Sequence, residues 1–515
     1  MVVRQTESRT RKSIRNAQVA LFYYCINLIL QFFSRKIFLD RLGAEILGLN
    51  TTAMNLLQFL NLAELGIGSA VSFTLYKPLV ENDHLKINEI VSVQGYLYRK
   101  IGFFVLGSAL ILMCFFPWLF AKAKLPLWYA YATFIVLLAS SLAGYFFNYR
   151  QIVLTADQKD YKLNFVVQNI KVLKIVTQII AISLLVNGYV WWLLLEFIAT
   201  VVTVIAINWI VRKEYAWLVS NPQQGRLLKN KYGIIITKIK QLFFHKIGSF
   251  ALTQISPLII YAFTSLTVVA IYGNYMLIVM GIMALLGAVF NSIGAGIGNL
   301  VAEGNRKHIL RVFNELFSFR FLLVCTACYG VYMLAQPFIT LWVGSSYLID
   351  SLSLSLIVVI LYFNTMRSVV DSYISAYGLF HDIWAPITEA CLNIGLSILF
   401  GYFWGLPGIL SGVLVGLFLI VFIWKPIFMF REGLKESLWI YVRMYIKHIA
   451  ALGIVLPTVT YIIRHIDSTP VSILDLLIYS LIVTGLFFVT LGVVLYAISQ
   501  GMRDAVSRFL KVGKI

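Results

Sequence analysis

The sequence predicts an all-α integral membrane protein with about fourteen transmembrane helices. Of its 515 residues, 60% are hydrophobic and 12% are charged, whereas soluble globular domains carry about 25% charged residues. Apolar runs of about 20 residues, long enough to cross a bilayer as a helix, recur between Ala17 and Ser499. Lipid is therefore the expected solvent for most of the chain.

The predicted spans follow these runs in order. They cover residues 17–38, 46–76, 98–120, 126–147, 162–186, 189–211, 242–263, 266–300, 312–341, 352–377, 386–404, 407–427, 445–463 and 473–498. Because their number is even, both termini are predicted on the same side of the membrane.

Basic residues are divided unequally between the two sides of the predicted membrane. On the side of the termini the topology places 32 Lys and Arg residues, and on the opposite side only six. Cytoplasmic connections are enriched in Lys and Arg, so both termini are predicted to be cytoplasmic. This topology accounts for the formal net charge of +20, and nucleic acid is not an expected partner.

The connections between the spans argue against several enzyme classes. The longest, 212–240, has about thirty residues, which is too short for a domain of its own. The chain has no Walker A run, which excludes a P-loop ATPase, and no large external loop for a glycosyl-transfer site. The five cysteines lie in apolar runs and are interpreted as packing residues. We predict no enzyme, no catalytic residue, no metal site and no cofactor.

An internal repeat predicts two lobes. The segments Glu64–Ala70 and Ile293–Asn299 both end an apolar run with closely spaced glycines and lead into a charged connection, about 225 residues apart. The segments Ala156–Asp160 and Ala376–Asp382 match at nearly the same offset. Small-residue packing between helices is the alternative explanation of the glycines.

The repeat pairs the first six spans with the next six in the same orientation. Parallel repeats of this kind occur in transporters, whose substrate sites lie where the repeats meet. The predicted lobes are 1–211 and 241–427, joined by a cytoplasmic linker at 212–240. The last two spans and a basic cytoplasmic tail occupy 428–515.

The fifth span carries a stripe of polar residues. They recur at steps of four and three residues, which places them within about 120° of one helix face, and they are Asn164, Gln168, Lys171, Lys174 and Gln178. Lys171 lies about 15 Å into the span, where a charge costs about 2.5–3.5 kcal/mol. The stripe is therefore expected to line a wet cavity, with snorkelling of both lysines to the interface as the alternative.

The tenth span has a polar face too, on which Arg367 and Asp371 are four residues apart and can pair. A neutralised structural salt bridge and a functional pair both remain open. Glu64, Asp371 and Glu389 are candidates to carry a coupling proton. A cavity with more cations than anions favours an anionic substrate such as phosphate or pyrophosphate.

Several motifs resemble a known superfamily. They are Phe33–Gly43, Ile46–Asn50, Leu62–Ala70 and Leu75–Leu79 in the first half, and Ala376–Gly378, Asp382, Pro386, Asn393 and Gly405–Leu410 in the second. With these motifs the chain resembles the Wzx-type polysaccharide (oligosaccharide-lipid) flippases of the multidrug/oligosaccharidyl-lipid/polysaccharide exporter superfamily, which includes MATE transporters. The resemblance implies two six-helix lobes in a V-shaped, MATE-like arrangement with alternating access.

The chain is also similar to lipid II flippases, which have fourteen helices and a cationic cavity. Arg35 stands where that pattern has an arginine in the first helix, but Lys36 stands where it has an aspartate. Drug exporters of the superfamily usually have twelve helices. The resemblance therefore favours a flippase over a drug exporter.

The expected function is ion-coupled flipping of polyprenyl-diphosphate-linked oligosaccharides in a bacterial cell membrane, driven by H⁺ or Na⁺. Expected partners are this anionic glycolipid, membrane lipids, a polysaccharide polymerase and glycosyltransferases. The residues expected to bind substrate are Arg35, Gln168, Lys171, Lys174, Gln178 and Arg367. The alternatives are a lipid II-type flippase, a MATE-like drug or cation antiporter, and a non-transporting scaffold of a polysaccharide assembly complex.

Overall fold

The computed structural model describes residues 9–64, 66–239, 255–290, 297–298, 300–301, 303–379, 381–465 and 470–512. Regular structure in these residues is entirely helical, which confirms the predicted all-α fold. Ten helical stretches among them are long and apolar enough to cross a membrane, and one of these, Trp384–Leu434, contains two of the predicted spans. The chain is therefore a multi-pass membrane protein. It divides into two compact units.

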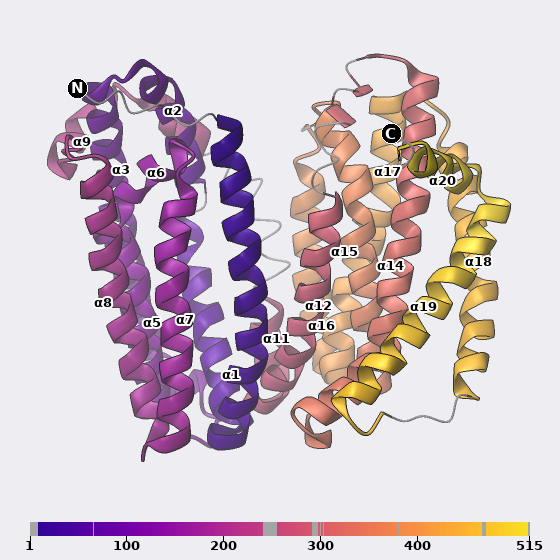
Figure 1. Ribbon diagram of the computed structural model, residues 1–515. Helices are drawn as coiled ribbons and strands as arrows, with labels where there is room; N and C mark the ends of the chain where they lie inside the picture. Colours follow the sequence, from indigo (N-terminus) through magenta and orange to yellow (C-terminus); the bar gives the residue numbers. More distant parts are fainter. Residues whose placement is uncertain are drawn as a thin grey trace. The chain divides into compact units, whose positions relative to one another are not determined.

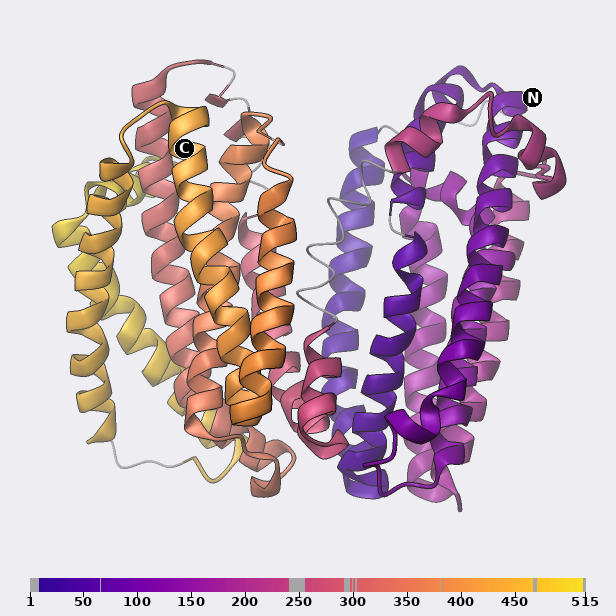
Figure 2. The same cartoon turned by 180° about the vertical axis from the view of Figure 1, so that it is seen from behind.

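The first unit takes the described residues up to Tyr261, together with Ser265–Ala270. Its helices are α1 (Arg9–Leu60), η1 (Asn61–Glu64), α2 (Ile67–Glu81), α3 (His84–Cys114), α4 (Phe116–Leu119), α5 (Leu127–Phe146), η2 (Tyr149–Gln151), α6 (Ile152–Ala156), α7 (Asp160–Leu184), α8 (Gly188–Glu214) and α9 (Pro222–Leu228). Helix α7 packs against both α1 and α8 (Figures 1 and 2). The predicted fifth span, with its polar stripe, is α7.

Glycines set where the first helices bend and break. The first two predicted spans meet inside α1 at Gly43, whose φ of 83° and ψ of 168° are open to glycine but strained for other residues. The predicted span 46–76 is in fact two helices. It breaks between Asn61 and Gly66, where Gly66 has φ 96°, and continues as α2. The glycine-rich segment of the predicted repeat is therefore a helix break in this unit.

The described part of the predicted linker, residues 212–239, packs against the first unit. Helix α9 lies on α3, and a Cβ at Gly225 would overlap the backbone carbonyl of Ser92. Further along, Tyr232 donates a hydrogen bond to Glu89 of α3 over 2.6 Å. The pKa of Tyr232 is raised well above its ordinary value. Burial of the phenol is the larger cause, and the neighbouring Glu89 carboxylate is the second. The segment is thus part of a folded body, while its role as an inter-lobe linker stays a prediction.

The second unit takes Ala262–Thr264 and the described residues from Ile271 onward. The chain passes between the units within α11 (Ser256–Phe263) and α12 (Leu266–Phe290). The further elements are α14 (Arg306–Trp342), η3 (Ser345–Tyr347), α15 (Ser351–Ala376), α16 (Trp384–Gly416), η4 (Leu417–Trp424), α17 (Lys425–Phe428), η5 (Met429–Leu434), α18 (Leu438–Arg464), α19 (Ile473–Ile498) and α20 (Gln500–Val512). The lobe boundaries predicted at 211, 240 and 427 stay predictions, and most of the predicted seventh span, 242–263, lies outside the described residues.

A glycine zipper brings the two arms of α16 together. The arms meet at Gly405, which has φ 59°, between the eleventh and twelfth predicted spans. Beyond the bend, Gly408, Gly412 and Gly416 recur every four residues. A Cβ at any of them would overlap the preceding arm, at Phe400, Ser397 and Asn393 respectively. Close approach of this kind is the usual role of small residues between membrane helices.

We expect Gly412→Ala to lower the free energy of unfolding by about 1–3 kcal/mol, because the added Cβ forces the two arms apart. The matched control is Gly395→Ala on the same helix, where an added Cβ would meet no atom within 4 Å. Alanine is the better helix former, so the control should unfold at the same or a higher temperature than the unsubstituted protein. Equal thermal shifts for the two variants would contradict this account of the zipper.

Candidate functional site

A tight connection between α7 and α8 sets the register of the polar stripe. Helix α7 ends at Leu184 and α8 begins at Gly188, after Asn187 adopts a left-handed conformation with φ 58°. A Cβ at Gly188 would come within 3.0 Å of the Ile182 Cα, so the two helices leave the turn in close contact. This hairpin places one side of the α7 stripe opposite α8.

Two residues of the stripe bind the carboxylate of Glu196 on α8. The Lys174 ammonium lies 2.7 Å from Glu196 Oε1. The Gln178 amide donates to Glu196 Oε2 and to the Trp192 carbonyl, each over 3.1 Å. The side chains of Lys174 and Glu196 are 20% and 15% exposed. The positive charge of Lys174 is therefore balanced inside the protein.

Another part of the stripe faces α1. The Asn27 amide donates to Gln168 Oε1 over 3.0 Å and to the Tyr23 carbonyl over 2.7 Å.

Lys171 lies on the stripe between Gln168 and Lys174, and its side chain is half-buried. It forms no hydrogen bond or ion pair with any residue that the structure describes. Lys171 thus carries the unbalanced charge of the stripe. The aqueous cavity expected there stays a prediction.

The other candidates of the first unit lie in separate surroundings. Arg35 on α1 is half-buried, and its Nη2 donates to the Ala270 carbonyl over 3.1 Å. Glu64, at the end of η1, accepts a hydrogen bond of 2.9 Å from the Tyr98 hydroxyl. Neither contact involves α7. Their roles as a substrate-binding and a coupling residue stay predictions.

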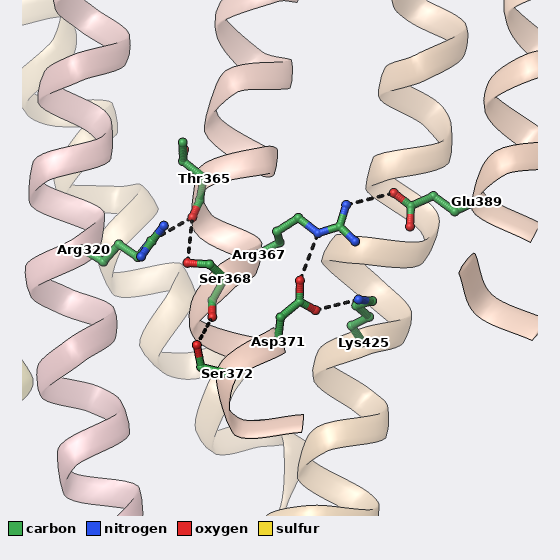
Figure 3. A network of polar contacts seen from close by, with 8 residues as sticks. All are labelled: Arg320, Thr365, Arg367, Ser368, Asp371, Ser372, Glu389 and Lys425. Atoms are coloured by element: carbon green, nitrogen blue, oxygen red, sulfur yellow. Dashed lines mark hydrogen bonds and ion pairs between the residues drawn. The ribbon is translucent and has the colours of Figure 1, made fainter. Parts of the chain in front are cut away.

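In the second unit, Arg367 lies between two carboxylates (Figure 3). Its Nε is 3.1 Å from Asp371 Oδ2, one turn along α15, and its Nη1 is 3.1 Å from Glu389 Oε1 on α16. Asp371 also forms an ion pair with Lys425, whose Nζ lies 2.6 Å from Asp371 Oδ1. Two cations and two carboxylates thus balance each other across α15, α16 and α17. This geometry favours the structural alternative for the Arg367–Asp371 pair.

Two basic residues that the sequence placed on the cytoplasmic side take part in buried contacts. Lys425, near the end of the predicted span 407–427, begins α17 and is 13% exposed while it binds Asp371. Arg320, predicted near the cytoplasmic start of its span, is 5% exposed. Its Nε donates to the Thr365 carbonyl over 2.8 Å, and its guanidinium lies 4.2 Å from the ring centroid of Phe290. The cytoplasmic side stays a prediction for both residues.

Comparisons with known proteins rest on the fold. Protein-family models and curated proteins give no match to this chain. Among solved structures, the lipid II flippase MurJ in its inward closed conformation superposes with a TM-score of 0.63 and 13% sequence identity, over 94% of this chain and 99% of that one. The chain has the MurJ fold.

A second solved structure agrees. A multidrug resistance MATE family transporter of the MOP superfamily, in its inward-facing conformation, matches with a TM-score of 0.59 and 13% identity, over 79% of this chain and 95% of that one. Both of these proteins are transporters rather than enzymes. At 13% identity the likeness concerns the MATE and MurJ fold and not the role of any side chain.

Proposed function

We propose that this protein flips a polyprenyl-diphosphate-linked oligosaccharide from the cytoplasmic to the outer leaflet of a bacterial cell membrane, with both termini in the cytoplasm. Alternating access coupled to H⁺ or Na⁺ would drive the movement. The cargo would come from glycosyltransferases and pass to a polysaccharide polymerase for assembly of a surface polysaccharide. The MurJ and MATE fold supports transport as the activity.

Lys171 is the observation that carries the proposal for an anionic cargo. It lies eleven residues from the start of α7 and thirteen from its end, about 16 and 20 Å along the helix axis. An ionisable residue at this depth marks a substrate or ion pathway more often than a structural contact. Lys174 lies one turn away and is paired with Glu196, so a diphosphate would bind Lys171 first and would compete with Glu196 for Lys174.

The test is transport by the purified protein in proteoliposomes. A fluorescent undecaprenyl-diphosphate-linked oligosaccharide in the inner leaflet becomes accessible to an external quencher only after it is flipped. We expect the unsubstituted protein to flip it, and Lys171→Gln to lower the initial rate by about tenfold, since removal of one phosphate-binding cation weakens such contacts by roughly 1.5–3 kcal/mol. The matched control is Lys77→Gln, whose lysine is 84% exposed, and it should flip at the normal rate.

Other outcomes identify the alternatives. A drug or cation antiporter would expel cationic dyes under an ion gradient and leave the labelled lipid in place. A lipid II-type flippase would prefer lipid II to other polyprenyl-diphosphate glycans. A scaffold would move none of them. Normal flipping by Lys171→Gln at equal protein levels would contradict the assignment of Lys171, whatever the cargo.

A further inference from the structure

Arg320 is a buried cation to which no residue that the structure describes supplies a carboxylate. It is 5% exposed, and it forms no ion pair in the part of the chain that the structure describes. That part includes every Asp and Glu of the chain except Glu7 and Asp467. Buried charges in proteins are as a rule paired or bound to a ligand of opposite sign. Arg320 departs from this rule.

The residue lies near the middle of the membrane-spanning helices. Its hydrogen-bond partner Thr365 is fourteen residues from Ser351 and eleven from Ala376, the two ends of α15. At 1.5 Å per residue these separations are about 21 and 16 Å. A charged side chain at this depth faces the interior of the helix bundle and marks a substrate or ion pathway by default.

The contacts of Arg320 leave one edge of the guanidinium unused. Its Nε is engaged by the Thr365 carbonyl, which also accepts from the Ser368 hydroxyl, and the ring of Phe290 lies against the cation. The two Nη groups form no hydrogen bond with any described residue. Parallel N–H groups on such an edge match the oxygens of a phosphate group, which arginine binds in a bidentate manner.

Arg367 offers a contrast within the same unit. Figure 3 shows Arg320 and Arg367 on different sides of α15, and among the described residues Arg367 has acidic partners whereas Arg320 has none. Arg320 contacts Thr365, whose carbonyl also accepts from the Ser368 hydroxyl, and both of these side chains are neutral. A negatively charged ligand would therefore meet an unbalanced cation at Arg320 and a neutralised one at Arg367.

We propose that Arg320 is the anion-binding residue of the second unit and that its Nη groups bind a phosphate or diphosphate group. The inference rests on the proposed function, since that function supplies a diphosphate cargo. The same chemistry is present in the headgroup of an anionic phospholipid. The two sources are separated by the probes used to test the site.

The test measures binding to the purified full-length protein. Undecaprenyl diphosphate and inorganic diphosphate are the first probes, and phosphatidylglycerol, counted by native mass spectrometry, is the second. Arg320→Gln keeps an N–H donor for Thr365 and removes the charge. We expect it to raise the dissociation constant of at least one probe by about tenfold, the loss expected for a charge-assisted pair. Arg306→Gln, a substitution at an exposed position of the same helix, should bind all probes normally.

Each outcome bears on the site. Weaker diphosphate binding by Arg320→Gln assigns the cargo to Arg320, and weaker phosphatidylglycerol binding alone assigns a membrane lipid. Unchanged binding of every probe would overturn the inference. If Arg320→Gln fails to fold, Arg320→Lys provides the test, since lysine keeps the charge but lacks the parallel N–H groups of the guanidinium. We expect this variant to bind about threefold more weakly. Unchanged affinity would overturn the site. A protein that binds diphosphate at Arg320 but flips no glycolipid refutes the proposed function and not this inference.

Discussion

Replacing Arg367 with methionine is expected to lower the free energy of unfolding by about 3–5 kcal/mol, because it leaves a buried carboxylate without its counter-charge. Glu389 is 2% exposed, and Arg367 is its ion-pair partner among the described residues. Asp371 is affected less, since Lys425 remains bound to its other oxygen. Thermal unfolding in detergent measures the effect, with Ser375→Ala on the same helix as the control.

The double variant Arg367→Met with Glu389→Gln tests whether the carboxylate is the cause. It removes both members of the pair, so no orphaned charge remains, and replacing both partners of a buried pair is often close to neutral. We expect it to recover most of the stability lost in the single variant. If the double variant unfolds as readily as Arg367→Met, the Arg367–Glu389 contact is not what stabilises these helices. Recovery of flipping together with stability would assign Arg367 a structural role.

Patterns within one helix predict well in this chain. The Arg367–Asp371 pair follows from a spacing of four residues, and it forms as predicted. The polar stripe of α7 follows from the same helical geometry. The helices also bend at Gly43 and Gly405, which lie between apolar runs. A glycine between two apolar runs is visible in the sequence, so bends of this kind can be located without knowing how the helices pack.

Contacts between helices were less accessible from the sequence. The pairing of Lys174 with Glu196 depends on the register of the α7–α8 turn at Asn187, and a shift of one residue would turn Glu196 by about 100° away. Lys174 and Glu196 are 22 residues apart on two different helices, so no spacing within one helix links them. The pairing of Asp371 with Lys425 spans 54 residues, so no local pattern could reveal it.

Lys174→Met is expected to slow flipping of the labelled glycolipid by about tenfold, through loss of a charge-assisted contact. The same substitution removes the ion pair of Glu196, so a loss of stability would have the same consequence for transport. A single variant therefore cannot separate cargo binding from folding. The contribution of the Lys174–Glu196 pair must be removed by a second substitution.

Lys174→Met with Glu196→Gln makes that separation. The double variant leaves no unpaired carboxylate, and Gln178 can still donate to the amide oxygen that replaces a Glu196 oxygen. We expect the thermal midpoint to return toward that of the unsubstituted protein while flipping stays slow. Restored flipping would show that Lys174 serves only to neutralise Glu196.

Glu196→Gln alone is expected to strengthen binding of the diphosphate cargo, whereas Lys174→Met is expected to weaken it. Lys171, Lys174 and Glu196 together carry one net positive charge, and loss of the carboxylate leaves two cations with no internal competitor for Lys174. A diphosphate should then bind more tightly, because low dielectric strengthens the added attraction, and it should be released more slowly. Tighter binding of undecaprenyl diphosphate together with slower turnover would indicate that Glu196 displaces the cargo from Lys174. Unchanged affinity would indicate that the charged group of the cargo binds away from α7.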